Sequence, residues 1–341
     1  MTGTSNSERF RKQFALARKW CATPAVAVVT AVAILGVPAA AQDDPGARYP
    51  SRVQVFVANS GGDSVTVYDT RMGVVTSTVP VGRTPVGVGA APNGDRVYVT
   101  NEQSNTLSVI DARSHAVVAT VPVGLHPFGV AVTPRNAYVT NFGSNTVTVV
   151  DVNTNAPVRE IPVGMFPHSA VASPDFTRVY VTDSGGQTVT VIDTASQQPT
   201  ASIPVGRFPA GIAISPDGDR LFVANTGSNN VTVIDPRTNT PIATTEVGNA
   251  PIGVSVTPAN SVFVANAGSN TVSVLDEDGN PAGPQIPVAE RPEGSAAAPD
   301  NSFVYVTNSR ANLMTVLDAV TAQPVTTVPV GAEPEGLAVT S

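Results

Sequence analysis

The chain has 341 residues and carries 19 basic against 26 acidic side chains, a formal net charge of −7. Both lysines lie within the first 19 residues, and the single cysteine is Cys21. This composition excludes a fold held by internal disulfides, and it argues against a basic surface for nucleic acid or anionic membranes.

The first segment, residues 1–41, has the pattern of a secretory signal. A basic stretch at residues 8–19 precedes an apolar, alanine-rich run from Ala22 to Ala41. Ala39-Ala40-Ala41 fits the small-x-small cleavage rule, so Gln42 is the expected mature N-terminus. An uncleaved anchor is the alternative, because the run is about long enough to span a bilayer, although its two prolines argue against that. Cleavage would give a secreted or cell-envelope protein without membrane insertion.

A short polar segment, residues 42–52, follows and is expected to be a disordered linker. Removal of residues 1–41 takes away five basic residues and one acidic residue, which leaves 14 arginines against 25 acidic residues, a net charge of −11. The exported chain is therefore expected to prefer cationic or neutral partners.

From residue 53 onward one phrase recurs seven times. A polar anchor ends its first strand and recurs every 40–42 residues, at Asn59, Asn101, Asn141, Asp183, Asn225, Asn266 and Asn308. An aspartate stands ten residues after each anchor, and a proline follows further along, at Pro85, Pro127, Pro167, Pro209, Pro251, Pro292 and Pro334. A period of about 40–45 residues with four strands per unit predicts a β-propeller.

Each unit contains four short β-rich segments, as in residues 97–134: VYVTN, TLSVID, AVVATVPV and PFGVAVTP. Turn residues such as Pro216-Asp217-Gly218 separate them. The chain enters on a VYVTN-type strand at Val53–Asn59 and leaves on a PxGVAV-type strand at Pro334–Val339. We therefore predict an all-β, seven-bladed propeller over residues 53–341. Its blades are four-stranded and antiparallel, and the C-terminal strand joins three N-terminal strands in one blade.

These repeats resemble the YVTN-family β-propeller repeat. The motif stands literally at Tyr98–Asn101 and Tyr138–Asn141, with variants at Tyr180–Asp183 and Phe222–Asn225. The resemblance covers about residues 53–341 and implies the fold. Relatives with this architecture are implied to include surface-layer proteins, binding proteins and lactonase-like enzymes, so the resemblance does not fix the function.

In a propeller, the loop that enters the inner strand and the hairpin after the second strand lie on one face, around the channel mouth. The residues next to each repeat proline vary most between the units, and they are the candidate ligand-binding residues. One arc carries aromatic and basic side chains: His126, Phe128, Phe166, His168, Arg207 and Phe208. The opposite arc carries Glu290, Arg291, Glu293, Glu333 and Glu335. We expect the aromatics to stack on a ligand and the carboxylates to take a cation or an amine; ordinary rim residues are the alternative.

No catalytic residue or resident cofactor is predicted. No histidines or carboxylates lie at metal-ligand spacing in the sequence, so a divalent-cation site or a hydrolytic His–Glu site would need residues that only ring closure brings together. The sequence also has no GxSxG motif for a serine nucleophile. Asp276–Asn280 resembles the start of a calcium loop but lacks the later glutamate, so we interpret it as a turn. The repeated aspartates and anchor asparagines are expected to cap turns by accepting backbone N–H bonds. His115 is expected to be exposed.

Three functions remain open. The first is an exported, monomeric, non-enzymatic propeller that binds a small molecule or a protein through its mouth. The second is a lactonase- or lyase-like enzyme that uses His126, His168 and the glutamates. The third is a structural module of the cell envelope.

Overall fold

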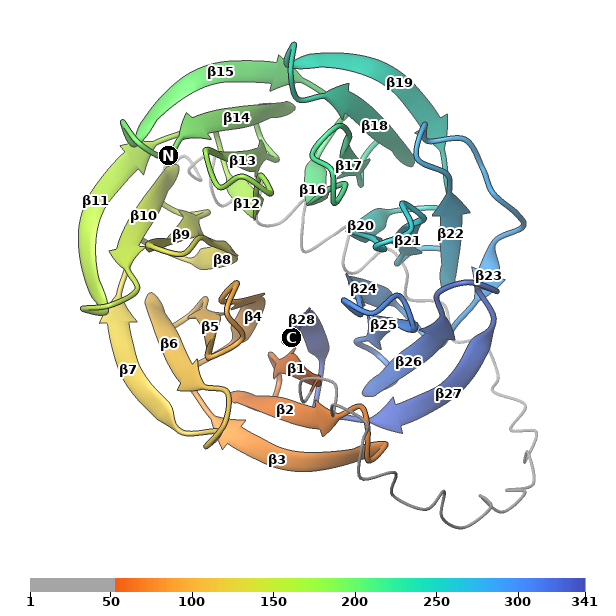
Figure 1. Cartoon of the computed structure of the whole chain (residues 1–341), viewed down its shortest axis with the longest axis horizontal. Helices are drawn as coiled ribbons and strands as arrows, with labels where there is room; N and C mark the ends of the chain where they lie inside the picture. Colours follow the sequence, from red (N-terminus) through yellow and green to blue (C-terminus); the bar gives the residue numbers. More distant parts are fainter. Residues whose placement is uncertain (1–52, 341) are drawn as a thin grey trace, which may run out of the picture. The chain divides into compact units, whose positions relative to one another are not determined.

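The computed structural model describes residues 53–340, and the predicted leader and linker, residues 1–52, lie outside them, as does Ser341. The described chain forms 28 β-strands in seven sheets of four strands each. The sheets stand as blades around a central axis (Figure 1). The predicted seven-bladed β-propeller is confirmed. None of the elements within residues 53–340 is a helix that could cross a membrane.

Every blade has four strand positions from the centre outward. The inner strands are β4 (Pro85–Ala90), β8 (Pro127–Val132), β12 (Pro167–Ala172), β16 (Pro209–Ile214), β20 (Pro251–Val256), β24 (Pro292–Ala297) and β28 (Pro334–Val339). The second strands are β1 (Gln54–Asn59), β5 (Arg96–Asn101), β9 (Asn136–Asn141), β13 (Arg178–Asp183), β17 (Leu221–Asn225), β21 (Val262–Asn266) and β25 (Phe303–Asn308). The third strands are β2 (Ser64–Asp69), β6 (Thr106–Asp111), β10 (Thr146–Asp151), β14 (Thr188–Asp193), β18 (Asn230–Asp235), β22 (Thr271–Leu275) and β26 (Leu313–Asp318). The outer strands are β3 (Val74–Pro80), β7 (Val117–Pro122), β11 (Ala156–Pro162), β15 (Gln198–Pro204), β19 (Thr240–Glu246), β23 (Ile286–Pro287) and β27 (Pro324–Pro329).

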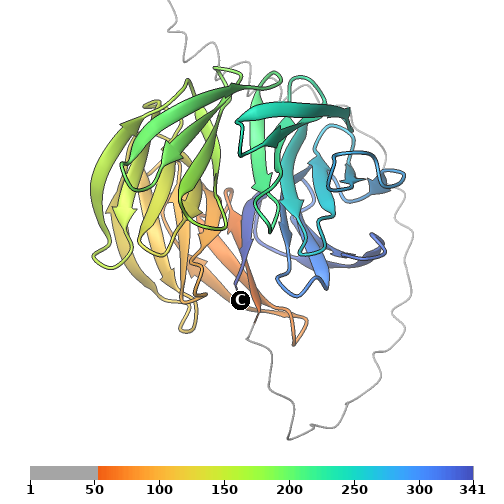
Figure 2. The same cartoon turned by 45° about the horizontal axis from the view of Figure 1, so that its top comes forward.

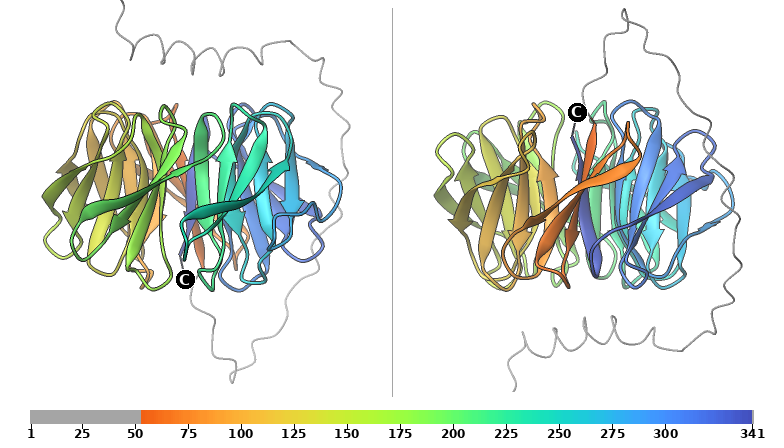
Figure 3. Two further views of the ribbon diagram at one scale, coloured as in Figure 1. Left: turned by 90° about the horizontal axis from the view of Figure 1, so that it is seen from above. Right: turned by 90° about the horizontal axis from the view of Figure 1, so that it is seen from below.

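Blade 1 combines β28 with β1, β2 and β3, and blades 2 to 7 each take four consecutive strands, starting at β4. Loops and hairpins join the strands at the two ends of the ring (Figure 2), which are best seen from the side (Figure 3). The chain therefore presents two separate loop faces, and only one of them carries the loops that enter the inner strands.

The apolar core lies between the blades. Side chains alternate along the second strand, so in β5 Val97 and Val99 pack toward blade 1 whereas Tyr98 packs toward blade 3. The same arrangement gives one buried cluster between each neighbouring pair of blades. This explains why the YVTN segment is apolar on both faces, as expected for a strand that is covered on two sides.

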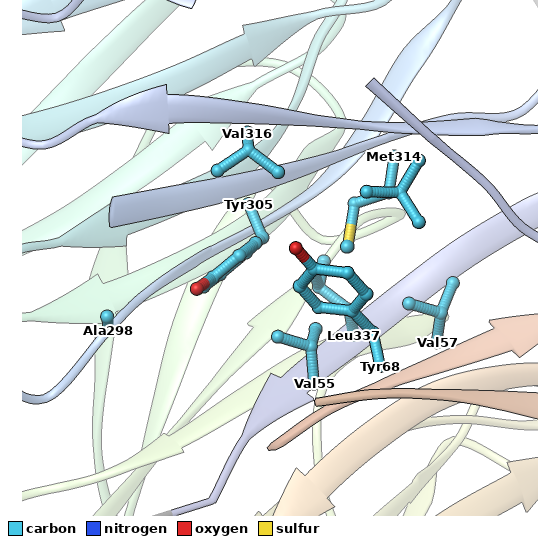
Figure 4. Packing of buried hydrophobic residues seen from close by; sticks show 9 residues of the cluster. Val55, Val57, Tyr68, Ala298, Tyr305, Met314, Val316 and Leu337 are labelled. Atoms are coloured by element: carbon cyan, nitrogen blue, oxygen red, sulfur yellow. The ribbon is translucent and has the colours of Figure 1, made fainter. Parts of the chain in front are cut away.

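Ring closure follows the prediction. β28 pairs antiparallel with β1, with Val339 opposite Val55 and Leu337 opposite Val57. The cluster between blades 7 and 1 contains Leu337 together with Tyr68 and Tyr305, whose ring centroids are 6.4 Å apart (Figure 4). The C-terminal strand therefore completes both a sheet and a core cluster, and it pairs the inner edge of β1.

A threonine in the strand motif links neighbouring blades. Thr140 Oγ1 accepts the N–H of Gly129 at 2.7 Å and donates to the carbonyl of His168 in the next blade at 2.8 Å. Equivalent bonds to the next blade come from Thr100, Thr182 and Thr307. Alanine stands at this position in the other three blades, so those interfaces lack the bond.

The repeated aspartates cap the turns after the third strands, as predicted. In blade 3, Asp151 Oδ1 accepts the N–H groups of Asn153 and Thr154 at 2.9 and 2.8 Å. These hydrogen bonds favour the ionised carboxylate and lower the pKa of Asp151. Asp276 behaves likewise, with Asp278 and Asn280 as donors, which agrees with a turn at that place.

The same role predicted for the anchor asparagines is wrong. Asn101 is 0% exposed, and its Nδ2 donates to Thr106 Oγ1 and Ser108 Oγ on the third strand, both at 3.0 Å. Its side chain fills the space that Gly82 leaves open, because a Cβ there would lie 2.6 Å from Asn101 Cγ. Glycine stands at this position in six copies of the repeat, whereas the seventh has Ala289, and there Asn308 Nδ2 donates to the Ala289 carbonyl at 3.0 Å. The anchor amide belongs to the core of the blade.

Two local features differ from the expectation. His115 is half-buried instead of exposed: its ring stands edge-on to Phe56, and its Nε2 lies 3.0 Å from Gln54 Nε2. Blade 6 has an outer strand of only two residues, since β23 comprises Ile286–Pro287. The preceding loop reaches blade 5 instead, where Thr245 Oγ1 donates to the carbonyl of Gly279 at 2.6 Å.

Candidate functional site

The loops that enter the inner strands and the hairpins between the second and third strands lie together. In blade 2, the N–H groups of Glu102 and Gln103 donate to the carbonyls of Thr84 and Arg83 at 2.9 and 3.3 Å. We call the face formed by these loops and hairpins the mouth face. All the candidate ligand-binding residues belong to it or to the first residues of the inner strands.

The residue before each repeat proline has a left-handed backbone. These residues have φ values of 48–56° and are Thr84, His126, Phe166, Phe208, Ala250, Arg291 and Glu333. In six of these loops the N–H is held by the hairpin of the preceding blade, as where Glu333 donates to Asn312 Oδ1 at 2.9 Å. This bond offsets the cost of a left-handed non-glycine residue and fixes the direction of its side chain.

Three of the predicted residues lie over glycines of the next hairpin. Phe166 covers Gly185, Phe208 covers Gly227, and His126 covers Gly143, where a Cβ would meet its ring at 2.8 Å. His126 also places Nδ1 3.5 Å from Glu102 Oε1. These side chains therefore pack between blades as well as border the mouth.

An aromatic cluster forms on blades 3 and 4. The Phe128 and His168 rings lie 4.2 Å apart, and Phe142 stacks on Phe166 at 5.0 Å, with 6.1 Å between Phe128 and Phe142. Three of these four residues were predicted. Phe142 was missed, although it follows the anchor Asn141, where the other blades have Ser60, Glu102, Ser184, Thr226, Ala267 and Ser309. A comparison of the repeats at this one position would have found it.

Blade 4 departs from the repeat beside this cluster. Ser169 stands where the other six inner strands have glycine, and its Oγ lies 3.1 Å from His168 Nδ1. At the equivalent Gly129 a Cβ would lie 2.7 Å from the carbonyl oxygen of His168, so space at this position is small. His168 itself is only 6% exposed. Sequence reasoning found His168 but not Ser169.

The glutamates of the opposite arc form two kinds of position. Glu293 and Glu335 occupy equivalent places on the adjacent inner strands β24 and β28, and they are 7% and 8% exposed. Glu293 Oε1 accepts Arg291 Nε at 2.6 Å and Ser309 Oγ at 2.9 Å, so this carboxylate is held in place. Glu290 and Glu333 are exposed on the loops.

The two arcs face each other across the mouth. β12, which carries His168, is three blades away from β24 in one direction and three from β28 in the other. Arg207 stands apart from both arcs, exposed on the loop between blades 4 and 5, where its N–H donates to Ser228 Oγ at 2.8 Å. The mouth therefore has an aromatic side and an acidic side.

Within residues 53–340 no three His, Cys, Asp or Glu side chains are grouped so that they could hold a metal ion. An open depression of about 320 Å³ lies at the rim between blades 2 and 3, where Gly124, Thr148, Arg159 and Glu160 contribute to its lining. It is separate from the predicted residues and has few convergent polar groups, so the mouth face stays the stronger candidate.

The fold and the comparisons identify a β-propeller repeat protein. A family model described as a YNCE-like beta-propeller matches residues 15–141, which is less than half of the chain. No curated protein matches this chain.

Two solved structures have the same fold. A chain of hydrazine synthase from Kuenenia stuttgartiensis aligns with a TM-score of 0.68 and 24% identity, covering 74% of this chain and 88% of that one. A functionally unknown protein from Desulfotomaculum acetoxidans DSM 771 aligns with a TM-score of 0.74 and 17% identity, covering 84% and 98%. At these identities the likeness concerns the fold alone.

Proposed function

We propose that this chain is an exported YVTN-type propeller that binds a small molecule or a protein partner through its mouth face. The observation that carries this proposal is the gathering of Phe128, Phe142, Phe166 and His168 on one side of the mouth. Aromatic side chains at the entrance of a concave site supply most of the contact area for a ligand. The opposite side offers carboxylates for a cationic group.

The arrangement favours binding over a hydrolytic site that pairs His168 with Glu293 or Glu335. His126 lies beside Glu102, and His168 lies beside Ser169 and Phe128. The inner strand that carries His168 is three blades from each of those that carry Glu293 and Glu335. A general base has to be within hydrogen-bond reach of its partner group, which this separation disfavours.

A thermal-shift screen of metabolites and divalent cations tests the proposal. A ligand that binds only the folded chain raises its melting temperature, by mass action. We expect at least one such ligand, and we expect its shift to disappear in Phe128→Ala and to shrink in Glu335→Gln. Glu277→Gln, on the opposite loop face, is the matched control. Shifts that persist in both mouth variants would place binding elsewhere and contradict the proposal.

Export is the second part of the proposal. The purified protein from the culture medium or the envelope should begin at Gln42, as determined by N-terminal sequencing. Recovery of the full-length chain in the membrane fraction would contradict cleavage. Light scattering should give the mass of a monomer, whereas an array would favour an envelope structural module.

A further inference from the structure

Two large apolar side chains stand exposed on neighbouring loops of the mouth face. Leu125 and Met165 are 54% and 51% exposed, and each is the second residue before a repeat proline. The other blades have at this position Arg83, Arg207, Asn249, Glu290 and Ala332. Only these two loops carry a large apolar residue at this position, and apolar side chains gathered on one exposed face are a common feature of interaction sites.

The pair belongs to one continuous surface. The hairpin of blade 3 lies between the two loops, where the N–H of Gly143 donates to the carbonyl of Leu125 at 2.9 Å. The neighbouring Phe142 is half-buried and stacks on Phe166, the residue after Met165. We call Leu125, Phe128, Phe142 and Met165 the apolar patch. Phe166 is only 8% exposed and supports the patch by stacking on Phe142. The segments 123–128, 142–145 and 163–168, which form the patch and its support, contain no Asp, Glu, Lys or Arg.

The far side of the mouth carries the complementary charge. Within residues 53–340, neither the Glu290 nor the Glu333 carboxylate makes a hydrogen bond or an ion pair. The nearby Arg291 donates its Nε to Glu293 at 2.6 Å. The loops and hairpin of this side contain four glutamates against two arginines, the second being Arg310 on the hairpin. We call Glu290 and Glu333 the acidic arc.

We propose that the mouth face docks an extended polypeptide segment of a partner protein, with a large apolar residue on the apolar patch and a lysine or arginine at the acidic arc. This inference rests on the proposed binding function and names its partner. Leu125 and Met165 stand out at loop tips, where they suit a surface contact better than an enclosed small molecule. An extended segment spans two sides of the mouth, and the glutamates repel an anionic membrane.

Selection from a library of random heptapeptides displayed on phage, with the exported chain immobilised, tests this proposal. We expect the enriched peptides to contain at least one large apolar residue and at least one Lys or Arg, and to be depleted in Asp and Glu. Synthetic copies are then titrated by fluorescence anisotropy. The Leu125→Ser/Met165→Ser variant should bind them at least tenfold more weakly. Glu290→Gln/Glu333→Gln should bind them about fivefold more weakly and with less dependence on salt.

The controls separate this proposal from misfolding and from the proposed function. Val158→Ser removes an apolar side chain that is 55% exposed on an outer strand, and Glu277→Gln removes a distant carboxylate; both should bind like the parent chain. The inference would be overturned if no peptide were enriched or if the enriched peptides were acidic. It would also be overturned if the patch variant bound them with unchanged affinity, or if the chain bound phosphatidylcholine vesicles in place of peptides. A small molecule whose thermal shift needs Phe128 would still support the proposed function in that case.

Discussion

The carboxylate of Asp183 accepts a hydrogen bond of 2.7 Å from Thr190 Oγ1 in the interior of blade 4, where Asp183 is 0% exposed. The other six blades carry a neutral asparagine at this position. Burial disfavours the ionised form more than the threonine donors favour it, and it raises the pKa of Asp183 to about 6. One blade therefore holds a titratable group where its neighbours hold an amide.

This group should make stability depend on pH. The folded pKa of about 6 lies above the ordinary value for an aspartate, so the folded chain binds the proton more tightly. The contribution of Asp183 to stability is fully present below about pH 4, is lost as the pH rises to about 6, and stays lost above that. Asp183→Asn should remove this dependence and raise the free energy of unfolding at pH 8 by on the order of 2–3 kcal/mol.

Urea unfolding at pH 4 and at pH 8 measures this difference. Asn141→Asp, in the neighbouring blade, is the matched reverse change, because Asn141 Nδ2 donates to two threonine hydroxyls where Asp183 Oδ2 accepts from two. It should introduce a second loss of stability over the same pH range. Equal pH profiles for the parent chain and Asp183→Asn would refute the assignment.

The inter-blade threonine bond should contribute measurably. Thr140→Ala leaves the buried N–H of Gly129 and the carbonyl of His168 without this hydroxyl, so it should lower the free energy of unfolding by about 1–3 kcal/mol. Thr140→Ser keeps the hydroxyl and should lose less. The measurement is chemical denaturation, and a Thr140→Ala variant as stable as the parent would contradict a stabilising role for the bond.

Ring closure should be the most sensitive point of the fold. Leu337 is 8% exposed in the cluster between blades 7 and 1, so Leu337→Ala should cost about 2–4 kcal/mol. Removal of residues 334–341 should leave β1 with an unpaired edge and give aggregated material on size-exclusion chromatography. A monomeric, cooperatively unfolding truncated chain would contradict the role of β28.

Serine at the glycine position of the inner strand should be tolerated in blade 4 only. Gly129→Ser would bring a Cβ to 2.7 Å from the carbonyl oxygen of His168, so we expect a loss of about 1–3 kcal/mol. Ser169→Gly restores the residue that the other blades have, and it should change stability by less than about 1 kcal/mol. Thermal unfolding of the two variants tests the pair, and equal losses would contradict the crowding argument.

The repeat predicted the architecture well because its signals are periodic. The number of blades follows from the anchor spacing and from the proline that begins each inner strand. The pairing of β28 with β1 follows from the strand type that is missing at each end. The caps at Asp151 and its equivalents were also predictable, since aspartate before a turn has one common role. These features depend on local chemistry and on chain connectivity.

The parts that were missed depend on contacts between segments that the repeat pattern does not link. Asn101 looks like a turn residue in sequence, but the space left by Gly82 draws its amide into the blade, and His115 reaches Gln54 of another blade. Phe142 joins the aromatic cluster only because the hairpin of blade 3 lies next to the loop before Pro167. The contacts of these side chains can be found only from the three-dimensional arrangement of the repeats, because periodicity in sequence does not predict them.

The pairing of β28 with β1 also brings the two ends of the ring together. The Thr340 N–H donates to the Gln54 carbonyl at 2.9 Å, and the Gln54 N–H donates to Thr340 Oγ1 at 3.2 Å, so the two ends of the ring are neighbours. A few glycines would connect them without strain. New termini could then be cut into the exposed turn at Asn153, and the permuted chain would keep every strand pair of the parent. The order of the blades along the chain would then change, while their order around the ring would stay the same.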